Sequence, residues 1–597
     1  MAQKQQSKWR FAPKKSFSSK ALSRRMKKVE GATVKHARRF VISRWKNVRE
    51  VRRHVGLWAL AVGLLIGAAG LQIFWYQQSY RVMAGAENGT YVEGVMGPVN
   101  TLNPIFASTS AEESASSLIF SRLLRHDTSG KLNYDLAESM RLSEDSRTYT
   151  IDLRDDAKWH DGVSVRARDV AFTVNLLKDA STRSTVSGWG DIVVKAEDEN
   201  TVSFRLPSVY AAFPHALNYL PILPEHLLRD VEPAELREHR FSQQPVGSGP
   251  FRFRFKQDLD IDSGRKIIYL ARNDSYYKGR AKLDRFQLHV YDTADAIVRG
   301  LNTSEVNAAT DLALSDLERI NTNRYQVSSE PINNGVYAIF NTTKGVLEDE
   351  KIRRALQVGT DTSSVRSSVG DDLVALDLPF LRDQVDAELP TAPEYNVKRA
   401  AELLDEAGWK VDGGVRKKDG EPLKLNFVTS KNSDLEKALR SLTDQWQKLG
   451  IVVTTSIVDP SDPSQNVVQN ILQPRNYDVL LYRLAIGGDP DVYAYWHSSQ
   501  ATRGLNFATY SNQAADDALA SARTVTDKKL RDAKYATFAK QWMSDAPAIG
   551  LFQTTTQYVY SPAVHSTDAD KTYVTPTDRY ADVIYWTVGD AIVHRTP

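Results

Sequence analysis

The sequence has 597 residues, a formal net charge of +4 and no cysteine. A chain of this length is too long for a single hydrophobic core, so we expect two or more domains. The lack of cysteine excludes disulfide bonds, thiol nucleophiles and any lipid anchor attached through a cysteine.

The charge is distributed unevenly along the chain. Residues 1–53 contain 18 Lys and Arg against 2 Asp and Glu, a net charge of +16, whereas the whole chain contains 77 basic and 73 acidic residues. Residues 54–597 therefore contain 59 basic and 71 acidic residues, a net charge of −12. This asymmetry predicts that the two parts lie in different surroundings.

An uncharged stretch runs from Val55 to Tyr80, directly after the basic region. Its apolar part is about as long as a helix that crosses a hydrocarbon layer of roughly 30 Å, so we expect a transmembrane anchor over residues 54–78. Positive charge is retained on the cytoplasmic side, which predicts a cytoplasmic tail over residues 1–53 and an extracytoplasmic remainder. The alternative is a cleaved signal, because residues 84–86 have the small-residue spacing of a cleavage site. The apolar and basic segments are both longer than such signals require.

The basic tail has two interpretations. Clusters such as SRRMKK, beginning at Ser23, are compatible with nucleic-acid binding. A polybasic segment directly before a membrane span is instead attracted to anionic lipid headgroups. Its position therefore favours contact with membrane lipid, and we expect no nucleic-acid partner.

The region after residue 86 shows both strand and helix periodicity. Residues 149–153 and 202–206 alternate apolar and polar side chains, as half-buried strands do, and so do residues 251–255. Leu435, Leu439, Leu442 and Trp446 mark one face of a helix that we expect to end at Gly450. A second such helix is expected to end at Gly408. This mixture predicts an α/β architecture.

Several motifs in this region occur together and in order. Residues 143–162 read SEDSRTYTIDLRDDAKWHDG, and ARDVAF follows from Ala167. Further pieces are LNPIFA from Leu102, PVGSGPF from Pro245 and GDPDVYAYW from Gly488. Across roughly residues 87–560 the chain resembles the peptide-type (oligopeptide, dipeptide and nickel) extracellular solute-binding proteins of ABC importers.

The resemblance implies a two-lobe periplasmic-binding-protein fold of type II, in the large peptide-binding subclass with an extra subdomain. Ligand would be enclosed between the lobes, which would rotate about a hinge. The boundaries that we expect are 87–334 for lobe I with a family insert at about 125–240, 335–553 for lobe II, 554–597 for a return to lobe I, and hinge strands near 336–341 and 549–553.

The resemblance also suggests where ligand binds. Some family members hold a ligand's α-ammonium on a carboxylate at the position that is Ile486 here. Either Asp489 or Asp491 takes that role, or the ligand has no free amine, since a charge in a closed cleft needs a partner. The remaining candidate ligand-binding residues are Asn341 and the aromatic residues Tyr493, Trp496 and Trp189, for which core packing is the alternative.

We expect no catalytic residues, cofactor or metal site. His160 and Asp161 are adjacent, so on an extended chain they point to opposite faces, and a turn closed by Gly162 is the better interpretation. The Gly247–Pro250 run lacks the spacing of a nucleophile elbow and predicts a tight connection into the next strand. Without a nearby His or Cys, Asp489 and Asp491 do not indicate a transition-metal site.

These observations predict a monomeric, membrane-anchored substrate-binding subunit of an ABC transporter. It would capture peptides outside the cytoplasm and deliver them to permease subunits. Two alternatives remain open. The ligand is a non-peptide solute, either an oligosaccharide or a metal chelate, or the chain is a receptor or surface-assembly protein without a transport role.

Overall fold

The computed structural model describes Lys35 and residues 48–79, 81–260, 264–459, 465–566 and 571–594. It divides into two compact units, which are residues 1–84 with 592–597, and residues 85–591. Most of the predicted basic tail lies outside the described residues.

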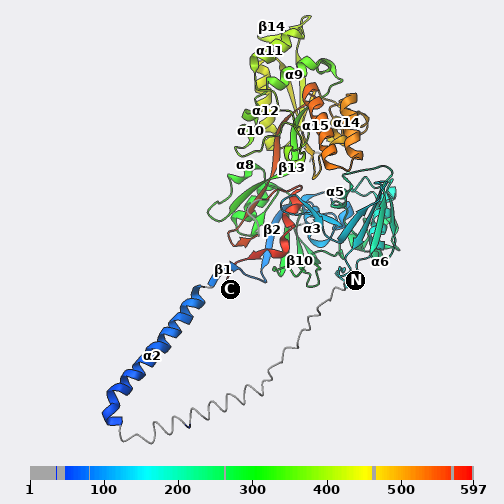
Figure 1. Cartoon of the computed structure of the whole chain (residues 1–597). Coiled ribbons are helices and arrows are strands. Elements are labelled where there is room, and N and C mark those ends of the chain that lie inside the picture. Colours follow the sequence, from blue (N-terminus) through cyan, green and yellow to red (C-terminus); the bar gives the residue numbers. More distant parts are fainter. Residues whose placement is uncertain are drawn as a thin grey trace, which may run out of the picture. The chain divides into compact units, whose positions relative to one another are not determined.

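Helix α2 (Val48–Ser79) dominates the first unit (Figure 1). Its segment Arg52–Tyr76 has a mean hydropathy of 2.0, and none of its most apolar window is buried in protein. Within the described part of the chain, it is the one helix long and apolar enough to cross a membrane. The N-terminal apolar helix expected from the sequence is therefore confirmed. Strand β1 (Arg81–Gly85) follows it and pairs with β23 (Asp590–His594).

A mixed sheet of ten strands runs through the second unit. Its longest members, β13 (Gln326–Phe340) and β20 (Ala548–Tyr560), lie antiparallel at its centre, paired from Gln326↔Tyr560 to Ile339↔Ala548. Parallel and antiparallel pairs both occur, as in α/β proteins. The order across the sheet is β18 (Val452–Val458), β17 (Lys424–Ser430), β19 (Val479–Ala485), β13, β20, β12 (Ala308–Ala309), β2 (Thr90–Met96), β11 (Arg285–Tyr291), β10 (Arg265–Arg272) and β9 (Phe251–Asp260).

The half of the sheet that runs from β18 to β13 is covered on both faces (Figure 1). Val336 and Phe340 of β13 belong to one apolar cluster, and the intervening Tyr337 and Ile339 belong to another. Strands buried on both faces read as continuous apolar runs, which explains the sequence VYAIF in this strand. The covering helices are α9 (Glu350–Val358), α10 (Thr362–Val369), α11 (Val397–Glu406) and α12 (Ser433–Lys448) in the first cluster, and α14 (Gln513–Thr524) and α15 (Lys528–Asp545) in the second.

Two helix ends predicted from the sequence are confirmed. Helix α11 stops at Glu406 and α12 at Lys448, and Gly408 and Gly450 follow them with φ of +88° and +84°. These left-handed conformations favour glycine, which has no Cβ to clash with the backbone.

A separate four-stranded sheet packs beside helix α4 (Ala167–Lys178). The predicted strand at residues 149–153 is its β6, with Tyr149, Ile151 and Leu153 buried and the alternate residues partly exposed. The strands are β5 (Ala137–Leu142), β6 (Thr148–Leu153), β8 (Thr201–Arg205) and β7 (Val193–Ala196), and the short elements nearby are β3 (Leu124–His126), β4 (Leu132–Tyr134), α5 (Phe213–Leu217) and α6 (Glu225–Leu228).

The other half of the large sheet, which includes β2 and β11, packs against α3 (Ser110–Ile119), α7 (Ala294–Asn302) and the C-terminal segment around η11 (Pro576–Tyr580). Strand β9 forms the edge of this sheet. Its predicted apolar face is therefore buried at Phe251 but exposed at Phe255, which stacks on Tyr269. The remaining short helices and strands are α8 (Leu314–Leu317), α13 (Tyr493–Trp496), β14 (Lys410–Asp412), β15 (Val415–Lys418), β16 (Glu421–Pro422), β21 (Val564–His565) and β22 (Thr587–Val588).

Candidate functional site

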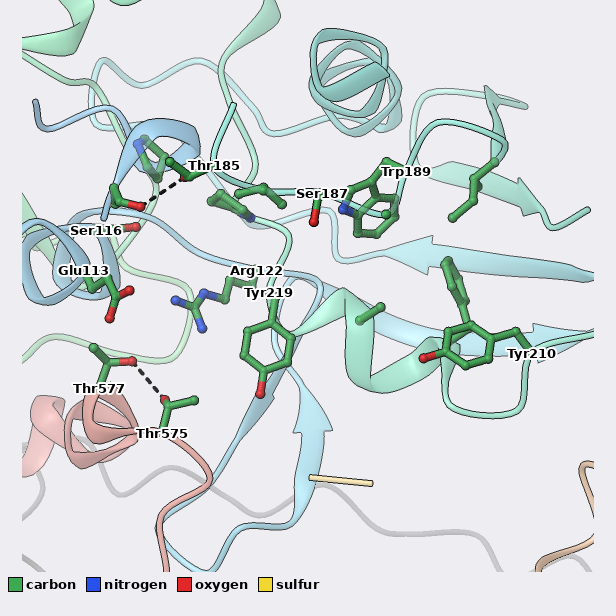
Figure 2. Close-up of a pocket in the computed structure, with 18 of the residues that line it drawn as sticks. Glu113, Ser116, Arg122, Thr185, Ser187, Trp189, Tyr210, Tyr219, Thr575 and Thr577 are labelled. Atoms are coloured by element: carbon green, nitrogen blue, oxygen red, sulfur yellow. Dashed lines mark hydrogen bonds between the residues drawn. The ribbon is translucent and has the colours of Figure 1, made fainter. Parts of the chain in front are cut away.

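A cavity of about 610 Å³ opens where distant segments of the chain meet (Figure 2). Helix α3 contributes Glu113, residues 185–192 form one wall, and residues 210–221 form another. Arg122, Arg523 from α14 and the C-terminal segment 575–577 also line the cavity. Apolar walls with a few polar groups, in a volume of roughly 300–1,000 Å³, are typical of small-ligand sites.

Glu113 and Arg122 are charged groups of this lining that have no bonded protein partner. Neither side chain forms a hydrogen bond or ion pair with any residue that the structure describes. Partial loss of hydration raises the pKa of the Glu113 carboxyl, and Arg122 opposes this rise. Burial also lowers the pKa of the Arg122 guanidinium, and the nearby Arg125 lowers it further. By accessible surface the Glu113 side chain is exposed and that of Arg122 is half-buried, so both charges remain hydrated and within reach of a ligand.

The local fold holds these two side chains in place. Helix α3 begins after Thr109, whose hydroxyl accepts a hydrogen bond from the Glu112 backbone NH at 3.3 Å. Glu113 therefore lies in the first turn, where the helix dipole favours a negative charge. Arg122 comes just after the helix, and its backbone NH donates to Asp135 at 3.2 Å.

Arg523 lies between two tyrosines at the edge of the cavity. Its Nε donates to Asp491 Oδ2 at 3.0 Å, and its guanidinium stands 4.7 Å from the ring of Tyr210 and 4.5 Å from that of Tyr493. The Ala211 backbone NH also donates to the Arg523 carbonyl at 2.8 Å. These contacts join residues 210–211 to α14 and close one side of the cavity.

Both predicted candidate carboxylates are already paired with arginine. Asp489 Oδ2 accepts a hydrogen bond from Arg531 Nη1 at 2.6 Å, and Asp491 pairs with Arg523. Burial raises the pKa of Asp491, while Arg523 opposes the rise. Neither Asp489 nor Asp491 is a lining residue of the cavity.

The other predicted residues fall into two groups. Trp189 lines the cavity, with its ring 6.1 Å from Phe213, and Tyr493 lies beside it through Arg523. Trp496 is 1% exposed and packs on Trp542. Ile486 is also buried, in the same apolar cluster.

Asn341 is buried at the end of β13, away from the cavity lining. Its amide accepts from Thr509 Oγ1 at 2.8 Å and donates to the Arg475 carbonyl at 3.3 Å. The structure thus brings Tyr493 and Asp491 onto Arg523 and places Trp189 in the lining of the same cavity, while Asn341, Ile486 and Trp496 pack against other parts of the protein.

Sequence reasoning missed most of the cavity. The residues not predicted include Glu113, Arg122, Tyr210, Tyr219, Arg523, Thr575 and Thr577. They come from four segments that are far apart in the sequence, at residues 113–122, 210–219, 523 and 575–577, so no local spacing links them. Arg122, a charge beside the apolar Leu123 and Leu124, was the one local signal.

The motif residues His160 and Asp161 are structural. The His160 backbone NH donates to the Gly247 carbonyl at 2.8 Å, and its ring hydrogen bonds with the Gly249 carbonyl at 3.1 Å. Asp161 pairs with His226 at 2.7 Å, and Gly162 closes the turn with φ of +94°. The predicted turn is confirmed.

The chain is similar to known binding proteins over most of its length. Residues 131–506 match the family model of bacterial extracellular solute-binding proteins, family 5 Middle. The oligopeptide-binding protein AppA of Bacillus subtilis is 29% identical over 486 residues, which cover 78% of this chain and 86% of AppA.

Solved structures agree with this similarity in fold. The structure of B. subtilis AppA in complex with a nonapeptide gives a TM-score of 0.68 at 25% identity and covers 85% of this chain and 100% of AppA. NikZ from Campylobacter jejuni in complex with Ni(L-His) gives a TM-score of 0.69 at 25% identity and covers 83% and 99%. The chain therefore has the expected α/β periplasmic-binding-protein fold, and it belongs to the bacterial extracellular solute-binding proteins of family 5, the peptide and nickel family of ABC transporter binding proteins.

Proposed function

We propose that this protein captures short peptides in the cavity beside Arg523 and delivers them to the permease of an ABC importer. The observation that carries the proposal is the cavity itself, about 610 Å³ in volume and lined by tyrosines, a tryptophan, hydroxyl groups and unpaired charges. Such a lining suits a peptide, which offers polar backbone groups, charged ends and varied side chains.

The cavity would open and close by movement of two lobes. We assign residues 87–334, including an insert at 125–240, and residues 554–597 to lobe I, and residues 335–553 to lobe II. The long strands β13 and β20 would then form the connection about which the lobes rotate. Arg523 and Tyr210 would meet only in the closed form, and ligand would favour that form through the contacts it gains there.

Peptide is the ligand class that the relatives favour. The solved AppA structure holds a nonapeptide. The probable D,D-dipeptide-binding periplasmic protein DdpA of Escherichia coli is another relative, at 25% identity. NikZ instead holds Ni(L-His), which makes a metal chelate the second candidate class.

Helix α2 would tether the protein to the membrane. The basic residues before it would keep the N-terminus in the cytoplasm and place the acidic binding module outside. Mass spectrometry of the membrane-bound protein tests this, since an intact N-terminus supports the anchor. A mature chain that begins after residues 84–86 would instead identify α2 as a signal.

The ligand class is tested by recovering what the protein carries. The full chain is purified in detergent and denatured, and the released small molecules are identified by mass spectrometry. We expect short peptides. The variant Ala216→Trp, which fills the cavity, should carry far less ligand, whereas Val193→Trp, on an exposed position of β7, should carry the wild-type amount.

Two results would contradict the proposal. One is recovery of a sugar or a nickel chelate with no peptide, which would reassign the ligand class. The other is equal ligand recovery from Ala216→Trp and wild type, which would place binding outside this cavity. Failure of the chain to copurify with permease subunits under crosslinking would favour a receptor role.

A further inference from the structure

We propose that Glu113 and Arg122 determine ligand specificity, with Glu113 binding the ligand's ammonium group and Arg122 binding its carboxylate. The ligand class is thus a short peptide with both ends free. This inference rests on the proposed function, because it assigns the ends of the peptide that the cavity would hold.

The predicted amine-binding carboxylates are not available for this role. Asp489 is held by Arg531, and Asp491 is held by Arg523. A ligand ammonium could bind either carboxylate only by displacing a guanidinium. The hydrogen bonds lost to arginine would then offset those gained with the ligand. Among the described residues that line the cavity, Glu113 is the one carboxylate.

The carboxylate of the ligand has one available cationic partner in the described part of this lining. Two cationic side chains line the cavity among the described residues, Arg122 and Arg523. Arg523 is neutralised by Asp491, so Arg122 is left to meet a ligand carboxylate. A guanidinium presents paired NH groups that match the two oxygens of a carboxylate.

The charged groups near Arg122 are bonded elsewhere and leave its guanidinium open to a ligand. Asp578 acts electrostatically on Arg122, but it is 1% exposed and its carboxylate accepts the Thr575 backbone NH at 2.8 Å. Arg125 repels Arg122 and donates to Ser117 Oγ at 2.6 Å. The Glu113 and Arg122 side chains attract each other without direct contact (Figure 2). The ammonium and the carboxylate of one ligand could each form a charge-assisted hydrogen bond with one of these two side chains.

The test uses peptides whose ends are blocked one at a time. Alanine peptides of two to five residues are titrated calorimetrically into the full-length protein in detergent, and the tightest binder is compared with its N-acetylated and C-amidated forms. For wild type we expect each block to weaken binding by about tenfold or more, as for the loss of a hydrogen bond to a charged group.

Each variant should abolish the response to one block only. Glu113→Gln should bind the free and the N-acetylated peptide within about threefold of each other, while still discriminating against the amide. Arg122→Gln should show the reverse pattern. Arg122→Lys keeps the positive charge but lacks the paired NH groups of the guanidinium. It should therefore retain part of the preference for a free carboxylate.

Controls separate binding from folding. Glu138→Gln and Arg147→Gln, at exposed positions outside the cavity, should keep both preferences. If Arg122→Gln fails to fold, as judged by its melting temperature, Arg122→Lys and Glu113→Gln decide the question.

The inference is overturned if no unblocked alanine peptide binds, or if Glu113→Gln weakens the free and N-acetylated peptides equally. The proposed function is judged separately, by the ligands recovered from the purified chain. Recovered peptides together with an unchanged end preference in both variants would refute the role of Glu113 and Arg122 and leave peptide capture intact.

Discussion

The ion pair between Glu93 and Arg579 provides the sharpest test of how the C-terminal segment completes the fold. Glu93 lies in β2 and is 0% exposed, and Arg579 lies in η11 and is 2% exposed at its side chain. Arg579 donates to Glu93 Oε1 through Nη2 at 2.6 Å and through Nε at 3.1 Å, and Tyr580 donates to the same oxygen at 2.6 Å. The pair therefore joins residues that are 486 positions apart.

Replacing Arg579 by methionine leaves the Glu93 carboxylate buried without its countercharge. Loss of one partner of a buried pair costs about 3–5 kcal/mol of unfolding free energy. Arg319→Met is the matched control, because Arg319 also pairs with a carboxylate at 2.6 Å, that of Asp295, but both side chains are about half exposed. An exposed pair of this kind contributes little to stability, because water screens both charges.

The loss of unfolding free energy in Arg579→Met should also depend on pH. Burial already raises the pKa of Glu93, and Arg579 opposes that rise. Without Arg579 the native state keeps Glu93 protonated to a higher pH than the unfolded chain does. In the unfolded chain the pKa of a glutamate is near 4.5. The variant therefore loses stability relative to wild type as pH rises above that value.

Urea unfolding followed by tryptophan fluorescence measures both effects, since Trp586 lies 6.0 Å from the Tyr580 ring and reports on this region. We expect Arg579→Met to unfold at lower urea than Arg319→Met at pH 7, with a smaller difference at pH 5. Equal midpoints for the two variants would refute the reasoning, because the buried pair would then contribute no more than an exposed one.

Three further predictions follow from single positions. Burial lowers the pKa of His126 to about 3, and His215 adds to the effect. The unfolded state therefore takes up a proton first, and wild type loses about 1.4 kcal/mol per pH unit as pH falls below about 6.5. His126→Gln should show a shallower loss in acid urea titrations. A Cβ on Gly249 would lie 2.6 Å from the Leu118 carbonyl oxygen, so Gly249→Ala should destabilise the protein by about 1–3 kcal/mol. Trp189 lines the cavity, so Trp189→Phe should remove most of the fluorescence change caused by bound peptide.

Each of these has a result that contradicts it. An unchanged acid slope in His126→Gln would mean that the buried histidine does not titrate differently on unfolding. The control for Gly249→Ala is Gly190→Ala, because no atom lies within 4 Å of the Cβ added there. Equal unfolding midpoints for these two variants would contradict the close packing at Gly249. A full fluorescence response in Trp189→Phe would place the ligand near another tryptophan.

The sequence by itself determined the local elements and the kind of fold. Periodicity within ten to twenty residues is enough to mark β6, with Tyr149, Ile151 and Leu153 on its buried face, and α12, which ends before Gly450. The apolar part of helix α2 was equally legible, because the length and lack of charge of the stretch from Val55 onward are local properties. These predictions succeeded since burial of one face follows directly from spacing.

Only the tertiary structure decided which charges remain for a ligand. The sequence suggested Asp489 and Asp491, yet α14 and α15 bring Arg523 and Arg531 onto them from more than thirty residues away. The unpaired Glu113 was invisible for the same reason. Whether a charged side chain has a partner depends on segments distant along the chain, and neither composition nor spacing records which of them meet in the fold.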